Sequence, residues 1–105
     1  MKDKITIGQN EFRIKTMNSL DLLAMQTQIS FDSAKQSRAC YAQILERLEV
    51  NCKDSWLPVK EEDKEVYFPA GLENDLTLVQ ELIGFFMEWF RDVFQKSNES
   101  NSKTE

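Results

Sequence analysis

The stretch DLTLVQELIGFFMEWFRDVFQ, residues 75–95, decides the fold of this chain. At the roughly 100° per residue of an α-helix, its large apolar side chains share one arc of about 200°, and its polar side chains fill the remainder. Asn74 or Asp75 can cap the start of the helix, because either side chain can accept a hydrogen bond from the first turn. The stretch therefore predicts a long C-terminal amphipathic helix.

The apolar arc of this helix is wider than a small domain requires. A helix that packs on one side of a core needs an apolar stripe only a little over about 100° wide. Two explanations stay open. Earlier elements could clasp the helix from both sides and bury the whole arc, or part of the arc could bind a second copy or a partner protein. A membrane surface is a poorer fit, because the polar face of the helix is acidic rather than basic.

We assign four large apolar side chains of the arc to its outer edge. Aromatic residues lose little rotamer entropy on binding and dominate the energetics of protein interfaces. The pattern alone leaves open which edge of the arc faces the core. The predicted partner-binding or oligomer interface consists of Leu78, Leu82, Phe85 and Trp89.

The chain opens with an alternating pattern over residues 4–15, KITIGQNEFRIK. Ile5 and Ile7 point to one side and Lys4 and Thr6 to the other, as in a half-buried strand, and the alternation resumes after a link that contains glycine and asparagine. This pattern predicts an N-terminal β-hairpin. Because an isolated hairpin is marginally stable in water, its apolar face is expected to pack on the helices.

Two helices are expected after the hairpin. Ser19 is the predicted N-cap of the first helix, directly ahead of Leu20. Residues 34–49 are predicted to form the second helix, because apolar side chains that include Ile44 and Leu48 share one arc.

A region of different composition separates these helices from the last one. Residues 56–59, WLPV, and residues 66–68, VYF, are short β-prone runs joined by a charged link. They predict a short hairpin or ordered loop, which Pro58 and Pro69 restrict to the edge of a sheet or to a stiff loop.

The predicted fold class is α+β, mostly helical, with an N-terminal β-hairpin, two helices, a short hairpin or ordered loop, and a long C-terminal amphipathic helix. Residues 1–95 are expected to form a single globular domain, as suits a chain of 105 residues. Residues 96–105, KSNESNSKTE, contain no apolar side chain and are predicted to form a disordered polar tail.

The composition argues against an enzyme. The chain has no histidine, which excludes Ser-His and Cys-His dyads and imidazole ligands for zinc. The acidic residues of the link at 61–65 are expected to be solvated, and Cys40 and Cys52 fit small core residues better than a disulfide framework. We therefore expect no catalytic residues, no cofactor and no metal site.

Charge and hydropathy argue against nucleic acid and membranes as binding partners. A net charge of −5 provides no electrostatic footprint for nucleic acid. No apolar run approaches the about 20 residues of a membrane span, and the first residues, MKDKITIGQ, lack the apolar core of a signal peptide. These features predict a cytoplasmic protein that binds neither nucleic acid nor membrane.

The order of these features resembles the small tail assembly chaperones of long-tailed bacteriophages and of prophages in Gram-positive bacteria. The similar stretches are ITIGQNEFRIK at 5–15, NSLDLL at 18–23, WLPVK at 56–60 and VYFPAGL at 66–72. The closing helix and its polar tail complete the resemblance, which covers nearly the whole chain. Its most distinctive part is the WLPVK stretch followed by YFPAGL.

The resemblance implies a protein of the bacterial host cytoplasm that coats the phage tape-measure protein and keeps its hydrophobic helices soluble. Such proteins are displaced as tail-tube subunits polymerise, so they are absent from the mature virion, and a frameshifted longer form recruits the tail-tube protein. The features read from the residues fit this role, because a small acidic chain with an aromatic surface that acts as a homo-oligomer is suited to coating a long hydrophobic helix. The alternatives are a structural head–tail connector or a small protein-binding inhibitor or regulator.

Overall fold

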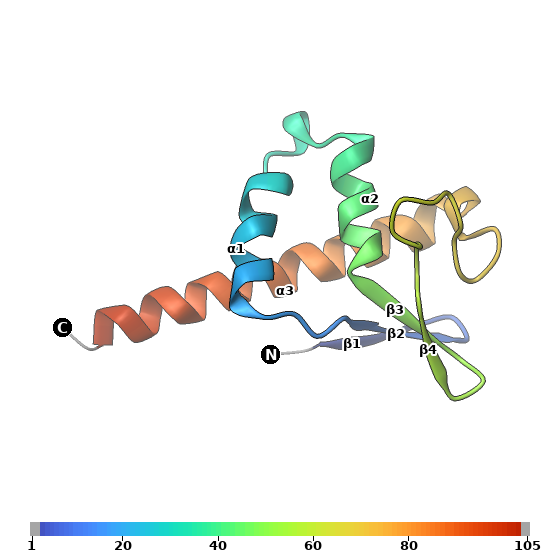
Figure 1. Ribbon diagram of the computed structural model, residues 1–105, viewed down its shortest axis with the longest axis horizontal. Coiled ribbons are helices and arrows are strands. Elements are labelled where there is room, and N and C mark those ends of the chain that lie inside the picture. The colour runs from blue at the N-terminus through green and yellow to red at the C-terminus, as the bar shows by residue number, and fades with distance from the viewer. Residues whose placement is uncertain (1–2, 104–105) are drawn as a thin grey trace.

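A four-stranded antiparallel sheet and three α-helices make up the chain in the computed structural model, which describes residues 3–103 (Figure 1). The predicted α+β class is confirmed. The elements follow in the order β1 (Lys4–Ile7), β2 (Asn10–Ile14), α1 (Ser19–Gln28), the 3-10 turn η1 (Ser33–Lys35), α2 (Arg38–Glu46), β3 (Leu48–Cys52), β4 (Ser55–Pro58), the 3-10 turn η2 (Leu72–Asn74) and α3 (Leu76–Lys103).

The N-terminal hairpin forms as predicted. β1 pairs antiparallel with β2, and Ile5 lies opposite Phe12 in the register. Gly8 opens the two-residue turn with a φ of +62°, a left-handed conformation that glycine adopts without a steric penalty. The strand order β1-β2-β3-β4 leaves β1 at one edge of the sheet.

The second hairpin differs from the prediction. β3 pairs with β4, so that Cys52 faces Ser55 across a two-residue turn, whereas the run at 66–68 contributes only an isolated bridge between Lys60 and Tyr67. The turn residues Lys53 and Asp54 have φ angles of 50° and 68°. A turn with two positive φ angles is usually signalled by Asn-Gly or Asp-Gly, and this chain has neither residue pair there.

Both early helices start at other residues than predicted, and the second also ends at another residue. The N-cap of α1 is Asn18 rather than Ser19, since the Asn18 side chain accepts a hydrogen bond of 2.9 Å from the backbone N–H of Asp21. Ser37 caps α2, which ends at Glu46, so residues 34–49 do not form one helix. The helix gives way to β3 because Leu48 pairs with β2 in the sheet.

The last helix continues further than expected. α3 runs to Lys103, beyond the predicted end near residue 95, and its C-terminal end extends past the other elements (Figure 1). Residues 96–103 contain neither glycine nor proline, so nothing in their sequence ends the helix. The predicted tail falls on this extension, and its residues 104 and 105 lie outside the described part of the chain. The domain boundary at residue 95 stays a prediction.

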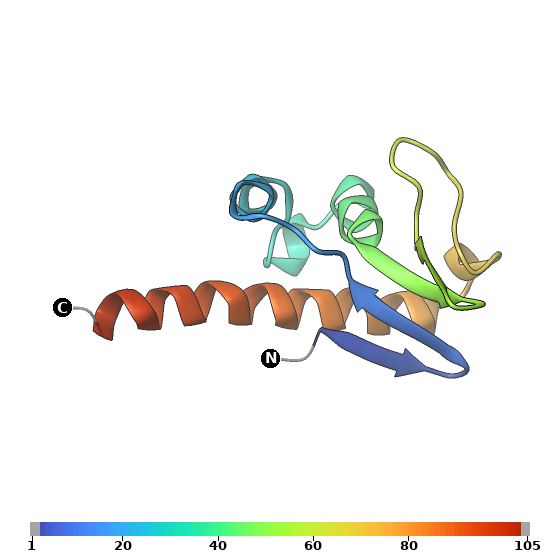
Figure 2. The same cartoon turned by 60° about the horizontal axis from the view of Figure 1, so that its bottom comes forward.

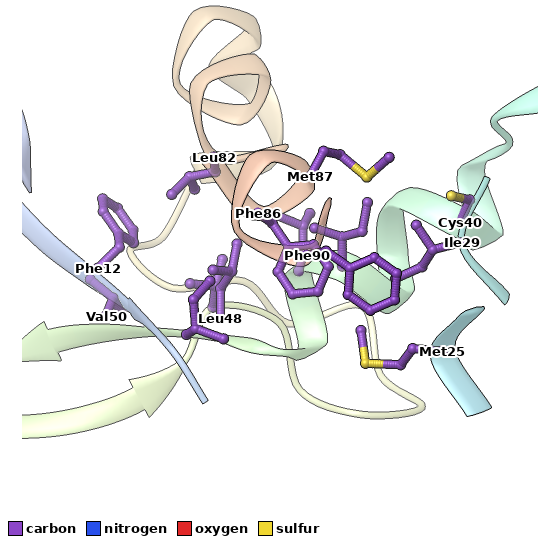
Figure 3. Packing of buried hydrophobic residues seen from close by; sticks show 14 of the residues in the cluster. Phe12, Met25, Ile29, Cys40, Leu48, Val50, Leu82, Phe86, Met87 and Phe90 are labelled. Atoms are coloured by element: carbon purple, nitrogen blue, oxygen red, sulfur yellow. The ribbon is translucent and has the colours of Figure 1, made fainter. Parts of the chain in front are cut away.

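The middle of the apolar arc of α3 forms the centre of the core. The rings of Phe86 and Phe90 lie 5.8 Å apart there, with strand residues on one side and Met25 and Ile29 on the other (Figure 3). Phe31, which follows α1, stacks on Phe90 at 5.6 Å. The sheet and the two shorter helices therefore clasp α3 from different sides, as Figure 2 also shows.

Candidate protein-binding surface

Burial along α3 divides the apolar arc into a covered middle and two partly exposed edges. Leu82, Phe86 and Phe90 are fully buried, and most of the apolar residues on either side of them are half-buried, although Met87 is buried and Leu76 is exposed. The earlier elements thus cover the middle of the arc and leave part of both edges in contact with solvent.

The predicted interface needs one correction. Leu82 is 0% exposed and lies toward Phe12 of the sheet (Figure 3), so it belongs to the core and not to the outer edge. Leu78, Phe85 and Trp89 are half-buried and share one edge of the arc. Leu82 was misplaced because the pattern on a helix does not show where a sheet formed by other segments will lie.

These three side chains border a groove between α3 and the edge strand β1, which we call the β1–α3 groove. It consists of three adjoining hollows of about 260, 450 and 60 Å³. The first and second share Glu81, and the second and third share Phe85 and Glu88. The lining residues are Ile5, Ile7, Gly8, Gln9, Asn10, Asp75, Thr77, Leu78, Glu81, Gly84, Phe85, Glu88, Trp89 and Asp92. The apolar side chains among them come from one strand and one helix far apart in the sequence.

Sequence reasoning missed the contribution of the strand to this groove. Ile5 and Ile7 were assigned to the buried face of the hairpin, where they do pack against the core. They stay half-buried because β1 has a neighbour on one side only. The alternating pattern shows which side chains share a face, but the order of strands in the sheet depends on pairings between distant segments.

A second hollow of about 520 Å³ lies along the opposite edge of the arc, and we call it the α2–α3 hollow. Its lining residues are Gln36, Tyr41, Leu76, Val79, Gln80, Ile83, Gly84 and Met87. Leu76 is 70% exposed. Val79 and Ile83 are half-buried beside this hollow and Met87 is buried, and the sequence pattern did not show that this edge of the arc would border a hollow.

The outer face of the sheet is mostly polar and its side chains pair with one another. Arg13 donates a hydrogen bond of 2.8 Å to Glu49 and lies 4.2 Å from the ring centroid of Trp56. Lys4 lies over the same ring at 5.9 Å. Trp56 is therefore partly covered by cations of its own chain.

Charged side chains outside the groove lie mostly at the surface and pair with one another. Between residues 3 and 103, no group of three or more Cys, Asp or Glu side chains is placed to hold a metal ion. In the acidic link, Glu61 pairs with Lys64 at 3.3 Å and Glu65 with Arg38 at 3.0 Å. Both pairs lie largely at the surface, where ion pairs contribute little to stability.

Comparison with known proteins finds no family model, no curated protein and no solved structure that matches this chain. Within residues 3–103, no helix combines the length and the apolar character needed to cross a membrane.

Proposed function

We propose that this chain is a non-enzymatic tail assembly chaperone of a phage or prophage that binds and solubilises the tape-measure protein. The observation that carries the proposal is the β1–α3 groove, in which Leu78, Phe85 and Trp89 remain half-buried beside the apolar side chains of an edge strand. Rigid aromatic side chains next to a hollow are typical anchors of protein interfaces. The resemblance of the sequence to tail assembly chaperones supplies the identity of the partner.

A chaperone of this kind has to cover an extended hydrophobic helix with many small copies. The long α3 runs along the length of the molecule (Figure 1), so an apolar edge on it could contact several turns of a partner helix. The net charge of −5 would help to keep the coated partner in solution. We propose that the protein acts as a homo-oligomer in the bacterial cytoplasm and is not part of the mature virion.

A frameshifted longer form, if the phage makes one, would recruit the tail-tube protein. The C-terminal end of α3 lies away from the sheet (Figure 1), so residues joined beyond it would leave the core unchanged. We propose this form as the link between the tape-measure protein and the growing tube.

Co-expression with the tape-measure protein tests the proposal. We expect a tagged chain to keep the tape-measure protein in the soluble fraction and to co-purify with it, and mass spectrometry of purified virions should not detect the chain. A chain found in stoichiometric amounts in virions would favour a head–tail connector instead. Capture of one defined host protein, without the tape-measure protein, would favour an inhibitor or regulator.

A further inference from the structure

Acidic side chains follow the apolar edge of α3 along the β1–α3 groove. Leu78, Glu81, Phe85, Glu88 and Asp92 succeed one another at spacings of three and four residues, so they form one stripe along the helix. Glu81 and Glu88 are exposed, and all five side chains line the groove. The apolar floor of the groove therefore has a negatively charged rim.

This charge is confined to one side of α3. The polar side chains that flank the opposite edge of the arc are Gln80, which lines the α2–α3 hollow, and Arg91, which lies 5.6 Å from the ring centroid of Phe31. None of the residues that line the β1–α3 groove is basic, and Lys4 of the adjoining strand lies over Trp56 on the outer face of the sheet. Among the residues whose side chains the structure describes, a ligand in the groove thus meets carboxylates and no lining cation.

We propose that the β1–α3 groove binds an amphipathic helix whose apolar stripe is bordered by Lys or Arg side chains. This inference rests on the proposed function and deepens it, since it specifies the charge of the helix that the chaperone selects. The lining residues of α3 repeat every three to four positions, which is the spacing at which one helix packs along another. Opposite charges beside an apolar contact direct the choice of partner and its register.

The same rim disfavours a second copy of this chain as the occupant. Two copies that met groove to groove about a two-fold axis would bring Glu81 and Glu88 of both chains together. Like charges in such a contact oppose association. A homo-oligomer is therefore expected to form through another surface.

Binding of two designed peptides to the full chain provides the test. Each peptide has about 18 residues, long enough to span the stripe at 1.5 Å per residue, with the same leucine stripe bordered by lysine in one and by glutamate in the other. We expect the leucine–lysine peptide to bind at least about tenfold more tightly by calorimetry, and to become helical by circular dichroism. Equal affinities, or a bound peptide in strand conformation, would overturn the proposal.

A matched pair of variants separates the rim from the net charge of the chain. Glu88→Lys and Glu62→Lys change the net charge equally, but Glu62 lies in the exposed loop after β4. We expect Glu88→Lys to weaken binding of the leucine–lysine peptide by about fivefold and Glu62→Lys by less than about twofold. The double variant Glu81→Lys/Glu88→Lys should bind the leucine–glutamate peptide better than the native chain does. Equal losses in the two single variants would contradict a local role of the rim.

The two proposals can fail separately. If the peptides are discriminated but the tape-measure protein is not captured, the assigned function is wrong and the charge preference of the groove stands. If the native chain and Glu88→Lys capture the tape-measure protein equally well and the peptides bind alike, the charge preference is wrong and the chaperone function stands.

Discussion

At the scale of single residues, one buried ion pair joins segments that the sequence did not place together. Lys60, which follows β4, donates a hydrogen bond of 3.2 Å to Glu46 at the end of α2, and the two side chains are only 6% and 9% exposed. Lys60 also donates to the backbone carbonyl of Glu61 at 3.2 Å. The pair fixes the loop after β4 against the helix, because each charge is costly to bury without the other.

Removing one partner should therefore cost more than removing both. We expect Lys60→Met to lower the free energy of unfolding by about 3 to 5 kcal/mol, since it leaves the Glu46 carboxylate buried without its cation. The double variant Glu46→Leu/Lys60→Met should recover most of that loss. Urea denaturation of both variants measures the difference, and equal losses would show that the pair is not coupled.

At the scale of elements, the sequence predicted the helices and strands that depend on the periodicity of their own residues. The alternation over residues 4–15 and the wide apolar arc of the last helix were enough to predict the first hairpin and α3, and both are present. β3 was missed because Leu48 fits the arc of the preceding helix as well as it fits a strand. The turn after β3 carried no signal, since Lys53 and Asp54 adopt positive φ angles without glycine or asparagine.

That turn is a place where the chain can be stabilised. We expect Lys53→Asn/Asp54→Gly to raise the free energy of unfolding by about 1 kcal/mol, because both new residues adopt left-handed angles at lower cost. The melting temperature should rise by about 4 to 8 °C for a domain of this size. A lower melting temperature would contradict the assigned turn.

Gly84 offers a second test, on the exposed side of α3. A Cβ atom added there meets no other atom within 4 Å, so Gly84→Ala fits the fold without rearrangement. Because glycine is a poor helix former, we expect the substitution to stabilise the protein by about 1 kcal/mol. Thermal unfolding followed by circular dichroism measures this, and a destabilised variant would indicate that the backbone of α3 bends at Gly84.

At the scale of the whole molecule, the sequence predicted a partner-binding surface on the last helix but did not determine which residues belong to it. The width of the apolar arc left open whether the chain would bury all of it or leave part of it for a partner, and Leu78, Phe85 and Trp89 are half-buried in the structure. The placement of Leu82, the contribution of β1 and the α2–α3 hollow all depend on how distant segments meet. Such contacts are set by packing between layers, which no periodicity along a single element reveals.

The central claim is that the edge of α3 with Phe85 and Trp89 contributes more to binding a partner than to the stability of the fold. Phe85→Gln/Trp89→Gln should reduce capture of the tape-measure protein at least about tenfold while lowering the free energy of unfolding by less than about 2 kcal/mol. Leu76→Gln, on the opposite edge, should leave capture unchanged, and Phe86→Ala in the core should cost about 3 kcal/mol or more.

The decisive measurement is therefore the ratio of captured tape-measure protein between the native chain and Phe85→Gln/Trp89→Gln, with unfolding of both followed in parallel. The account predicts a folded variant that has lost its partner. A variant that unfolds as Phe86→Ala does, or a folded variant that captures the tape-measure protein as well as the native chain, would contradict it.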